Sequence, residues 1–239
     1  MDDEDLCIGF VFEKWLDAQM FTDHSKEMFE WEDVKVLQGK FLHTKETDLT
    51  GAVVWDDAVV LSKFLRRNID LKMKRVVELG AGTGFLGVAL GKLGTADKVV
   101  ISDRSVMKDL IVHNIEANHV INQCEFWDHS WGSSIDESML GSFDIVVASG
   151  CVYHDEANAS LIDSIAKLGK VNAEIYFAID FRFDVSNRDI DEYVSPTLYH
   201  FFTLAERKGL VMETIELNQL LTSEDIKLSV RIYKCHVRA

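Results

Sequence analysis

The sequence lacks the features of a membrane protein or an extracellular protein. None of its apolar runs is long enough to span a bilayer. Its cysteines are Cys7, Cys124, Cys151 and Cys235. Their scattered spacing favours neither a disulfide framework nor a zinc site. Residues 1–5 are acidic, the opposite of a secretory or mitochondrial targeting segment. We therefore expect reduced thiols, no membrane partner, and a location in the cytoplasm with the nucleus as a second location.

Basic residues are scarce as well. The 239 residues include 25 Lys and Arg against 40 Asp and Glu, so the formal net charge is −15 at pH 7. Binding to a nucleic-acid backbone needs clustered Lys and Arg, so we expect no nucleic-acid partner. An acidic surface suits a basic or lysine-bearing substrate, and it equally serves solubility. The sequence also has no internal repeats and no low-complexity linker, so a single domain with one core is the simplest expectation. We expect a monomer by default.

What the sequence does contain is a glycine-rich turn that follows a short apolar run. Residues 76–79 are typical of a buried parallel strand that stops at Gly80. Gly80, Gly82 and Gly84 allow positive φ and a close approach of the backbone to a ligand, because they have no Cβ. Residues 85–93 have apolar positions at helical spacing. The pattern predicts a strand, a turn and a helix that together bind a nucleotide-like ligand.

Two acidic residues narrow the choice of ligand. Asp103 ends a second apolar run about 20 residues after the turn, where a carboxylate can bind both hydroxyls of a ribose. Glu78 precedes the first glycine by two positions and would repel a pyrophosphate at the helix N-terminus. S-adenosylmethionine carries an ammonium and a sulfonium in that region, so we favour it over a dinucleotide. The alternative is that Glu78 faces solvent or caps a neighbouring helix.

The rest of the chain alternates between strand and helix patterns. We expect strands at residues 124–127, 143–149 and 173–180 and helices at residues 55–67, 107–118, 155–168 and 192–208. Residues 211–217 and 226–237 alternate like two antiparallel strands, separated by a turn at residues 222–225. This order predicts an α/β three-layer sandwich whose sheet is mainly parallel and ends in an antiparallel hairpin. Pro196 would kink the last helix or mark its first residue.

The chain divides into an extension and a single globular unit. Residues 1–47 are expected to form an N-terminal extension packed on the core, and residues 48–239 the main domain. Within the extension, residues 31–42 partly alternate, and their Gln38-Gly39-Lys40 centre predicts the turn of a β-hairpin.

Aromatic residues flank the expected ligand site. Trp55 would stand at a helix start, where it could line the ligand pocket or belong to the core. Asp56 and Asp57 follow in the first helical turn, where the helix macrodipole favours acids. Trp131 could border an adenine or cover the sheet edge. His129 lacks ligand-like spacing, so a solvated or hydrogen-bonded role is expected.

Several segments together resemble a known family. They are residues 51–58 (GAVVWDDA), 77–84 (VELGAGTG), 130–132 (SWG) and 148–153 (ASGCVY), together with Asp103. These motifs are similar to the seven-strand, S-adenosylmethionine-dependent protein methyltransferases of methyltransferase family 16. Residues 53–56, 60–65 and 223–226 look closest to the member that methylates valosin-containing protein. The resemblance implies a Rossmann-like methyltransferase domain.

The resemblance also implies a cofactor site for S-adenosylmethionine. The contacts it implies come from Trp55, Gly80, Ala81, Gly82, Asp103, Trp131 and Ala148, to which the charge argument adds Glu78. Asp103 would bind the ribose, and Trp131 would lie near the adenine.

The substrate side departs from the family pattern at one position. The family has an Asp-x-x-Tyr signature after the fourth strand, and here Tyr153 matches the tyrosine while Gly150 replaces the aspartate. A carboxylate there would hold the lysine ammonium in line with the methyl group. Tyr153 can add cation–π attraction as the expected catalytic residue. In the absence of the aspartate, Asp155, Glu156 or Asp180 would have to substitute, although glycine can also simply widen the pocket.

The expected function is therefore a protein-lysine N-methyltransferase that acts on a specific protein substrate. An ATPase or chaperone-type protein is the candidate substrate that the resemblance implies. Two alternatives stay open: a cofactor-binding module that has lost turnover, indicated by Gly150, and a small-molecule methyltransferase on the same fold.

Overall fold

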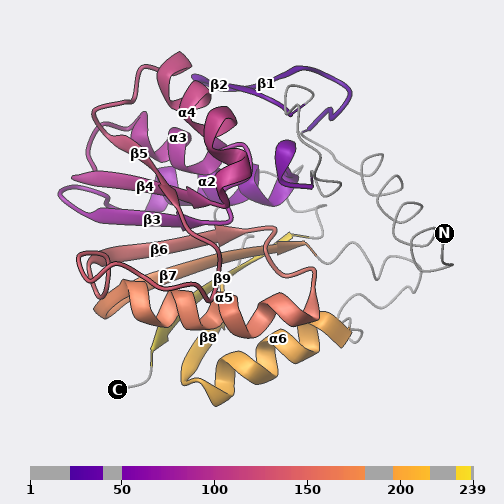
Figure 1. Ribbon diagram of the computed structural model, residues 1–239, viewed down its shortest axis with the longest axis vertical. Coiled ribbons are helices and arrows are strands. Elements are labelled where there is room, and N and C mark those ends of the chain that lie inside the picture. The colour runs from indigo at the N-terminus through magenta and orange to yellow at the C-terminus, as the bar shows by residue number, and fades with distance from the viewer. Residues whose placement is uncertain (1–21, 40–49, 181–195, 216–229, 238–239) are drawn as a thin grey trace, which may run out of the picture.

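The structure of the chain, a computed structural model, describes residues 22–39, 50–180, 196–215 and 230–237. These residues form a seven-stranded sheet flanked by helices and a separate two-stranded hairpin (Figure 1). The elements are β1 (Met28–Trp31), β2 (Val34–Leu37), the 3-10 turn η1 (Thr50–Ala52), α2 (Asp56–Asn68), β3 (Arg75–Leu79), α3 (Phe85–Gly91), β4 (Lys98–Asp103), the 3-10 turn η2 (Ser105–Met107), α4 (Lys108–Ala117), β5 (Cys124–Asp128), β6 (Phe143–Ser149), α5 (Asp155–Leu168), β7 (Gly169–Asp180), α6 (Pro196–Arg207), β8 (Leu210–Thr214) and β9 (Val230–Val237).

The sheet has the strand order β5-β4-β3-β6-β7-β9-β8. Strands β3 to β7 run parallel, and β9 runs antiparallel to both of its neighbours. The expected α/β sandwich with an antiparallel C-terminal pair is confirmed. Strand β3 has β4 on one side and β6 on the other, so the direction in which the chain winds reverses beside β3. Ligands of open α/β sheets bind at such a point, beyond the carboxyl ends of the strands.

Successive side chains of the central strands point to opposite faces, and each face has its own core. Val76 on β3 and Val147 on β6 pack in the core that includes α2, α3 and α4. Val77 and Val146 pack in the core that includes α5 and α6. Figure 1 shows α5 and α6 side by side along one face, with α2, α3 and α4 across the sheet. The continuous apolar runs of the sequence are therefore strands that are covered on both faces.

The N-terminal hairpin has its turn earlier than the sequence predicted. Strands β1 and β2 are joined at Glu32 and Asp33, and Glu32 has a φ of 50°. Gln38 and Gly39, where the sequence predicted the turn, do not join β1 to β2, and Lys40 lies outside the described residues. Gly39 instead donates its N–H to the carbonyl of Ala52 and lies too close to the Ala52 side chain to carry a Cβ. The glycine serves a close contact with the main domain, because that contact leaves no room for a side chain.

Two asparagines, Asn114 in α4 and Asn118 directly after it, hold the hairpin by its backbone. Asn114 accepts the N–H of Leu37 at 2.7 Å and donates to the Leu37 carbonyl at 3.1 Å. Asn118, one helical turn later, makes the same pair of bonds to Lys35, at 3.1 and 2.7 Å. Asn114 also donates to the carbonyl of Thr83 in the glycine turn at 2.9 Å. The two amides thus replace the neighbouring strand that the outer edge of β2 would otherwise need.

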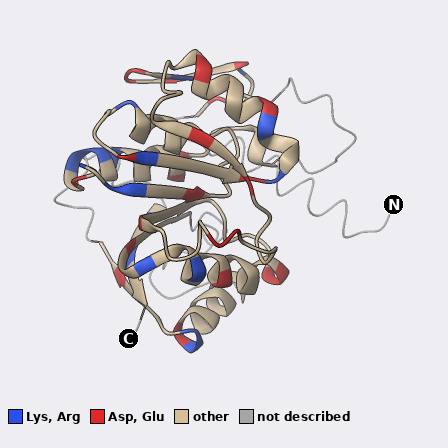
Figure 2. Ribbon diagram, turned by 60° about the vertical axis from the view of Figure 1, so that its left-hand side comes forward, with Lys and Arg blue, Asp and Glu red and all other residues tan. Residues whose placement is uncertain are grey.

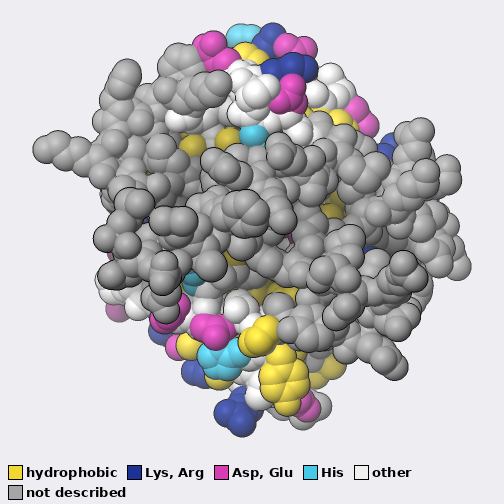
Figure 3. All heavy atoms as spheres, turned by 90° about the vertical axis from the view of Figure 1, so that its right-hand side faces the viewer, with side chains coloured by type: hydrophobic (Ala, Val, Ile, Leu, Met, Phe, Trp, Pro, Cys, Tyr) yellow, Lys and Arg dark blue, Asp and Glu magenta, His cyan; other side chains and the backbone are white. Residues whose placement is uncertain are grey.

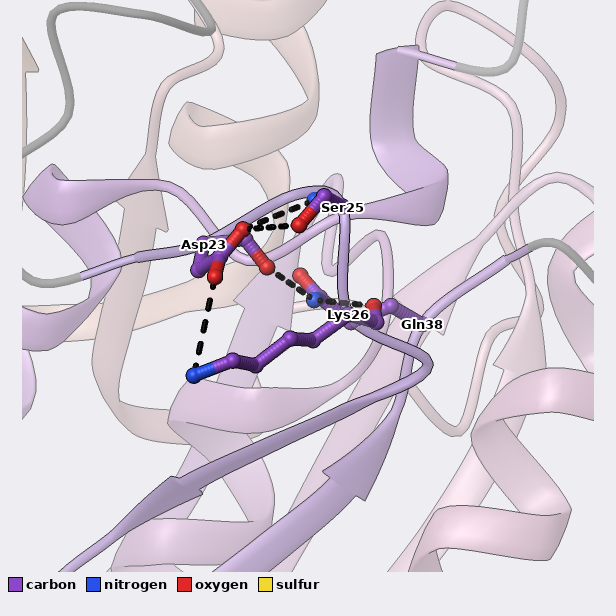
Figure 4. Close-up of polar contacts among 4 residues, drawn as sticks. All are labelled: Asp23, Ser25, Lys26 and Gln38. Carbon is purple, nitrogen blue, oxygen red and sulfur yellow. Dashed lines mark hydrogen bonds and ion pairs between the residues drawn. The ribbon is translucent and has the colours of Figure 1, made fainter.

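Gln38 joins the segment before β1 to the segment before α2, and Figure 4 shows its bonds to the first of these segments. Its Nε2 donates to the carbonyls of Asp23 and Lys26 at 3.1 and 3.0 Å. Its Oε1 accepts the N–H of Val54 at 2.9 Å. Gln38 is only 1% exposed, so these bonds replace those that water would otherwise make. The extension therefore fixes the backbone that leads into Trp55.

The helix starts that the structure describes are compatible with the sequence. Pro196 is the first described residue of α6, and residues 192–195 of the expected helix lie outside the described residues. Helix α2 begins directly after Trp55 and carries two aspartates in its first turn. The expected domain boundary at residue 47 and the expected turn at residues 222–225 lie outside the described residues.

Charged side chains of both signs occur along the described elements. Figure 2 shows Lys and Arg interspersed with Asp and Glu over helices and strands. Figure 3 shows acidic, basic, histidine and hydrophobic side chains next to one another at the margins of one side of the molecule.

No helix in the described ranges has the length and apolar character that a membrane crossing needs.

Substitution of Asn114 tests the role of the α4 amides. We expect Asn114→Ala to lower the free energy of unfolding by about 1–3 kcal/mol, because it leaves the buried carbonyl of Thr83 and the partly buried backbone groups of Leu37 without their partner. Chemical denaturation measures the change. Asn122→Ala, at an exposed position after α4, is the matched control, and equal stabilities of the two variants would contradict the prediction.

Candidate active site

A cavity of about 370 Å³ lies where β3, β4 and β6 end, beside the start of α2. Its size is within the range of small-molecule sites. Its lining is drawn from residues 50–58, 80–85, 103–107, 129–131 and 149–160. The cavity therefore occupies the point in the sheet at which the winding reverses, where the topology alone predicts a ligand.

The glycine turn after β3 forms one wall of the cavity. Gly80 has a φ of 65°, and a Cβ there would lie 2.6 Å from the Trp131 ring and 2.8 Å from the Cys151 sulfur. Gly82 has a φ of 57°, and its Cβ would overlap with the carbonyl oxygen of Gly51. Both positions need glycine for the backbone conformation and for the closeness of their neighbours.

Asp103 is fixed against this turn. Its Oδ2 accepts the N–H of Gly82 at 2.7 Å, and its Oδ1 accepts the N–H of Arg104 at 2.7 Å. The N–H of Ala81 donates to the carbonyl of Ser102 at 3.0 Å, so the turn is bonded to β4 at a second point. A half-buried carboxylate held in this way at the cavity fits the ribose of a nucleoside ligand.

Trp55 lines the cavity from the start of α2. Its indole N–H donates to the carbonyl of Thr50 at 2.9 Å. The ring of His24 meets the indole edge-on, with centroids 5.0 Å apart, and His24 Nε2 lies 2.7 Å from the carbonyl oxygen of Val54. Trp55 is therefore held in the cavity wall by contacts from the N-terminal extension.

Trp131 lines the cavity next to Gly80, and a buried histidine supports its loop. His129 Nε2 lies 3.1 Å from Ser164 Oγ on α5, and the imidazole stacks on Trp127 with centroids 4.4 Å apart. Burial lowers the pKa of His129, which keeps the ring neutral near pH 7. The expected hydrogen-bonded role of His129 is confirmed, and its place at the cavity is new.

Two of the expected cofactor residues lie behind the cavity wall. Ala148 is buried in β6. Glu78 is 2% exposed, and its Oε2 accepts the N–H of Gly87 at 2.8 Å in the first turn of α3. The carboxyl thus caps a helix N–H that has no partner within the helix, as one alternative held. Direct contact of Glu78 or Ala148 with a cofactor stays a prediction.

The surroundings of Glu78 change its acidity. Burial raises the pKa of its carboxyl to about 8, the charge of Asp103 adds to the rise, and the hydrogen bond from Gly87 opposes it. Glu78 is therefore mainly protonated in the folded protein near pH 7.

Tyr153 lines the cavity, whereas the three proposed substitutes for the missing aspartate do not. The ring of Tyr153 lies against His154, with centroids 4.5 Å apart. Asp155 and Glu156 begin α5 with exposed side chains, and Asp180 ends β7 outside the cavity lining.

Asp57 is the site residue that the sequence analysis missed. It is 1% exposed and, with Asp103, is one of the two carboxylates that line the cavity among the described residues. The sequence offered one signal, its place two residues after Trp55 in the GAVVWDDA segment. The helix macrodipole alone accounts for an acid in the first turn of a helix, so the sequence did not mark Asp57 as a site residue.

A glutamine at position 78 tests the buried carboxyl. In the unfolded chain Glu78 titrates near its ordinary value of 4.5, well below its folded pKa. Between the two values only the unfolded state is ionised, so stability falls as pH rises from about 5 to 8. We expect Glu78→Gln to remove this part of the pH dependence of the melting temperature. Glu116→Gln, at an exposed site on α4, should keep the wild-type slope, and an unchanged slope in Glu78→Gln would contradict the assignment.

Comparison with known proteins agrees with this geometry. Residues 37–195, more than half of the chain, match the model of the Methyltransf_16 family, described as lysine methyltransferase. The protein N-lysine methyltransferase METTL21A of Mus musculus is 30% identical over 191 residues, which are 78% of this chain and 78% of that protein. METTL21A of Danio rerio is 32% identical over 145 residues, 59% of this chain and 66% of that protein. The expected closeness to the enzyme of valosin-containing protein stays a prediction.

Solved structures agree on the fold. A SAM-dependent methyltransferase from Aquifex aeolicus superposes with a TM-score of 0.54 at 15% identity, over 76% of this chain and 90% of that chain. This likeness concerns the fold alone. The family match and the relatives lead to one conclusion, and the cavity beside the glycine turn is compatible with it. The chain belongs to the Methyltransf_16 family of lysine methyltransferases and is an S-adenosylmethionine-dependent methyltransferase.

Proposed function

We propose that this methyltransferase modifies lysine side chains of a specific protein substrate. The observation that carries the proposal is that one cavity is lined both by Asp103, fixed on the glycine turn, and by Tyr153, from the loop after β6. The net charge of −15 also suits a basic, lysine-bearing partner. The relatives in mouse and zebrafish are named protein N-lysine methyltransferases.

The described residues fit the cofactor in distinct ways. Asp103 would bind the ribose hydroxyls, the glycine turn would let the backbone approach the ligand, and Trp55 and Trp131 would cover it with apolar surface. When bound, S-adenosylmethionine supplies a methyl group that passes from its positively charged sulfur to a neutral amine.

The residues on the substrate side have a separate task. Tyr153 would meet the incoming lysine, whose ammonium is attracted to an aromatic face. The lysine must lose one proton before its nitrogen can attack. The neutral amine is held less strongly than the ammonium, so the alignment of the amine with the methyl group matters for the rate. The proposal has three further parts. The substrate is an ATPase or chaperone-type protein, the enzyme is a monomer, and it is located in the cytoplasm and the nucleus. The described cysteines, which form no disulfide, are compatible with these reducing compartments.

The second candidate is a cofactor-binding protein without turnover. It is favoured by Gly150, because the loop after β6 offers no side chain at the position where the family has its aspartate. A small-molecule methyltransferase is the third, since the same fold serves both substrate classes. Incorporation of methyl groups into the protein fraction of an extract, on lysine, excludes both.

Asp103→Ala tests the cofactor site and the activity together. Loss of the carboxylate removes charge-assisted hydrogen bonds, so we expect the calorimetric Kd of S-adenosylhomocysteine to rise at least about tenfold. Transfer of labelled methyl to lysines of extract proteins should fall in parallel. Asp128→Asn, at the exposed end of the neighbouring strand β5, is the matched control. Wild-type binding and transfer by Asp103→Ala would sink the assignment.

A further inference from the structure

We propose that Asp57 supplies the carboxylate that holds the lysine amine of the substrate, in place of a side chain at position 150. The inference rests on the proposed lysine methyltransferase function. Its basis is the space beside Gly150, where a Cβ would lie 2.9 Å from Oδ2 and 3.3 Å from Oδ1 of Asp57. A side chain at position 150 would point directly at this carboxylate. Asp57 therefore occupies, from α2, the place that a side chain would fill from the loop after β6.

The surroundings of Asp57 suit a negative charge that faces the cavity. Asp57 is the second residue of α2, where the helix macrodipole favours an acid. It lines the same cavity as Tyr153 and is almost fully shielded from bulk water. Burial and, next, the charge of Asp57 raise the pKa of the nearby Cys151 thiol, so Cys151 adds no second negative charge.

A carboxylate at this place acts on the amine in two stages. It first binds the lysine ammonium through a charge-assisted hydrogen bond. The ammonium then releases one proton to water, and its nitrogen forms a bond to the methyl carbon as the electron pair of the carbon–sulfur bond goes to sulfur. The positive charge moves from sulfur to nitrogen in this step. Asp57 would stabilise it there, since a fixed charge beside a developing opposite charge lowers the barrier.

The glycine at position 150 follows from the same geometry. Gly150 has a φ of 62°, a conformation that side chains rarely adopt. An aspartate there would also bring a second carboxylate into contact with Asp57, and two carboxylates at one site repel each other. Gly150 and Asp57 therefore form a matched pair in which one residue provides the charge and the other leaves room for it.

Binding of two cofactor analogues tests the charge without turnover. Sinefungin carries an amine-bearing carbon in place of the methyl-bearing sulfur, whereas S-adenosylhomocysteine has a neutral sulfur there. We expect Asp57→Ala and Asp57→Asn to raise the calorimetric Kd of sinefungin about tenfold or more. The Kd of S-adenosylhomocysteine should stay within about twofold of the wild-type value. Glu156→Gln, at an exposed carboxylate of α5, should change neither Kd. Equal effects on both analogues, or loss of both by the two Asp57 variants, would overturn the proposal, because Asp57 would then only support the pocket.

Moving the carboxylate provides the second arm. Labelled methyl transfer to extract proteins should fall in Asp57→Ala and in Gly150→Asp, and should recover at least partly in the double variant Asp57→Ala/Gly150→Asp, which restores one carboxylate. A double variant no better than Asp57→Ala would overturn the proposal. If the wild type transfers no methyl to protein lysines, the proposed function fails, and the ratio of sinefungin to S-adenosylhomocysteine affinity still decides whether Asp57 faces the reacting position.

Discussion

The site depends on the close contact that the glycine turn makes with its neighbours. The N–H of Gly82 donates to Asp103 at 2.7 Å, while the same residue lies against the carbonyl oxygen of Gly51. Any side chain at position 82 would separate these three segments. Because residue 51 leads into α2, the contact brings the start of that helix to the cavity. The positions of Trp55 and Asp57 follow from it.

The N-terminal extension is part of the same construction. A two-stranded hairpin has little stability of its own, and its outer backbone groups need partners. Asn114 and Asn118 provide them from one face of α4, and Gln38 bonds to the backbone before Trp55. These amides connect the hairpin to the glycine turn and to the wall of the cavity. The extension therefore supports the geometry of the cofactor site.

On the candidate substrate side, the carboxylate comes from a residue that is close to Gly150 in space but distant from it in sequence. At position 150 the chain has no side chain, and the exposed acids at positions 155 and 156 do not reach the cavity lining. Asp57 comes from a distant part of the sequence and lies beside Gly150. The carboxylate that is absent at one position can thus be provided by a residue that is distant in sequence and adjacent in the fold.

The sequence by itself determined the order of strands and helices, the glycine turn and the place of Asp103. Each of these depends on local chemistry: apolar periodicity, the freedom of φ at glycine, and the reach of a carboxylate at a strand end. The hairpin turn, the burial of Glu78 and the place of Asp57 were decided by tertiary structure. The close contact with Ala52 requires a glycine at position 39, and Glu78 caps α3 behind the cavity wall. Asp57 meets Gly150 beyond the carboxyl end of β6. Spacing along the chain left the Glu78 cap as one of two alternatives. It could not reveal the contacts of Gly39 and Asp57, because each joins segments that only the folded core brings together.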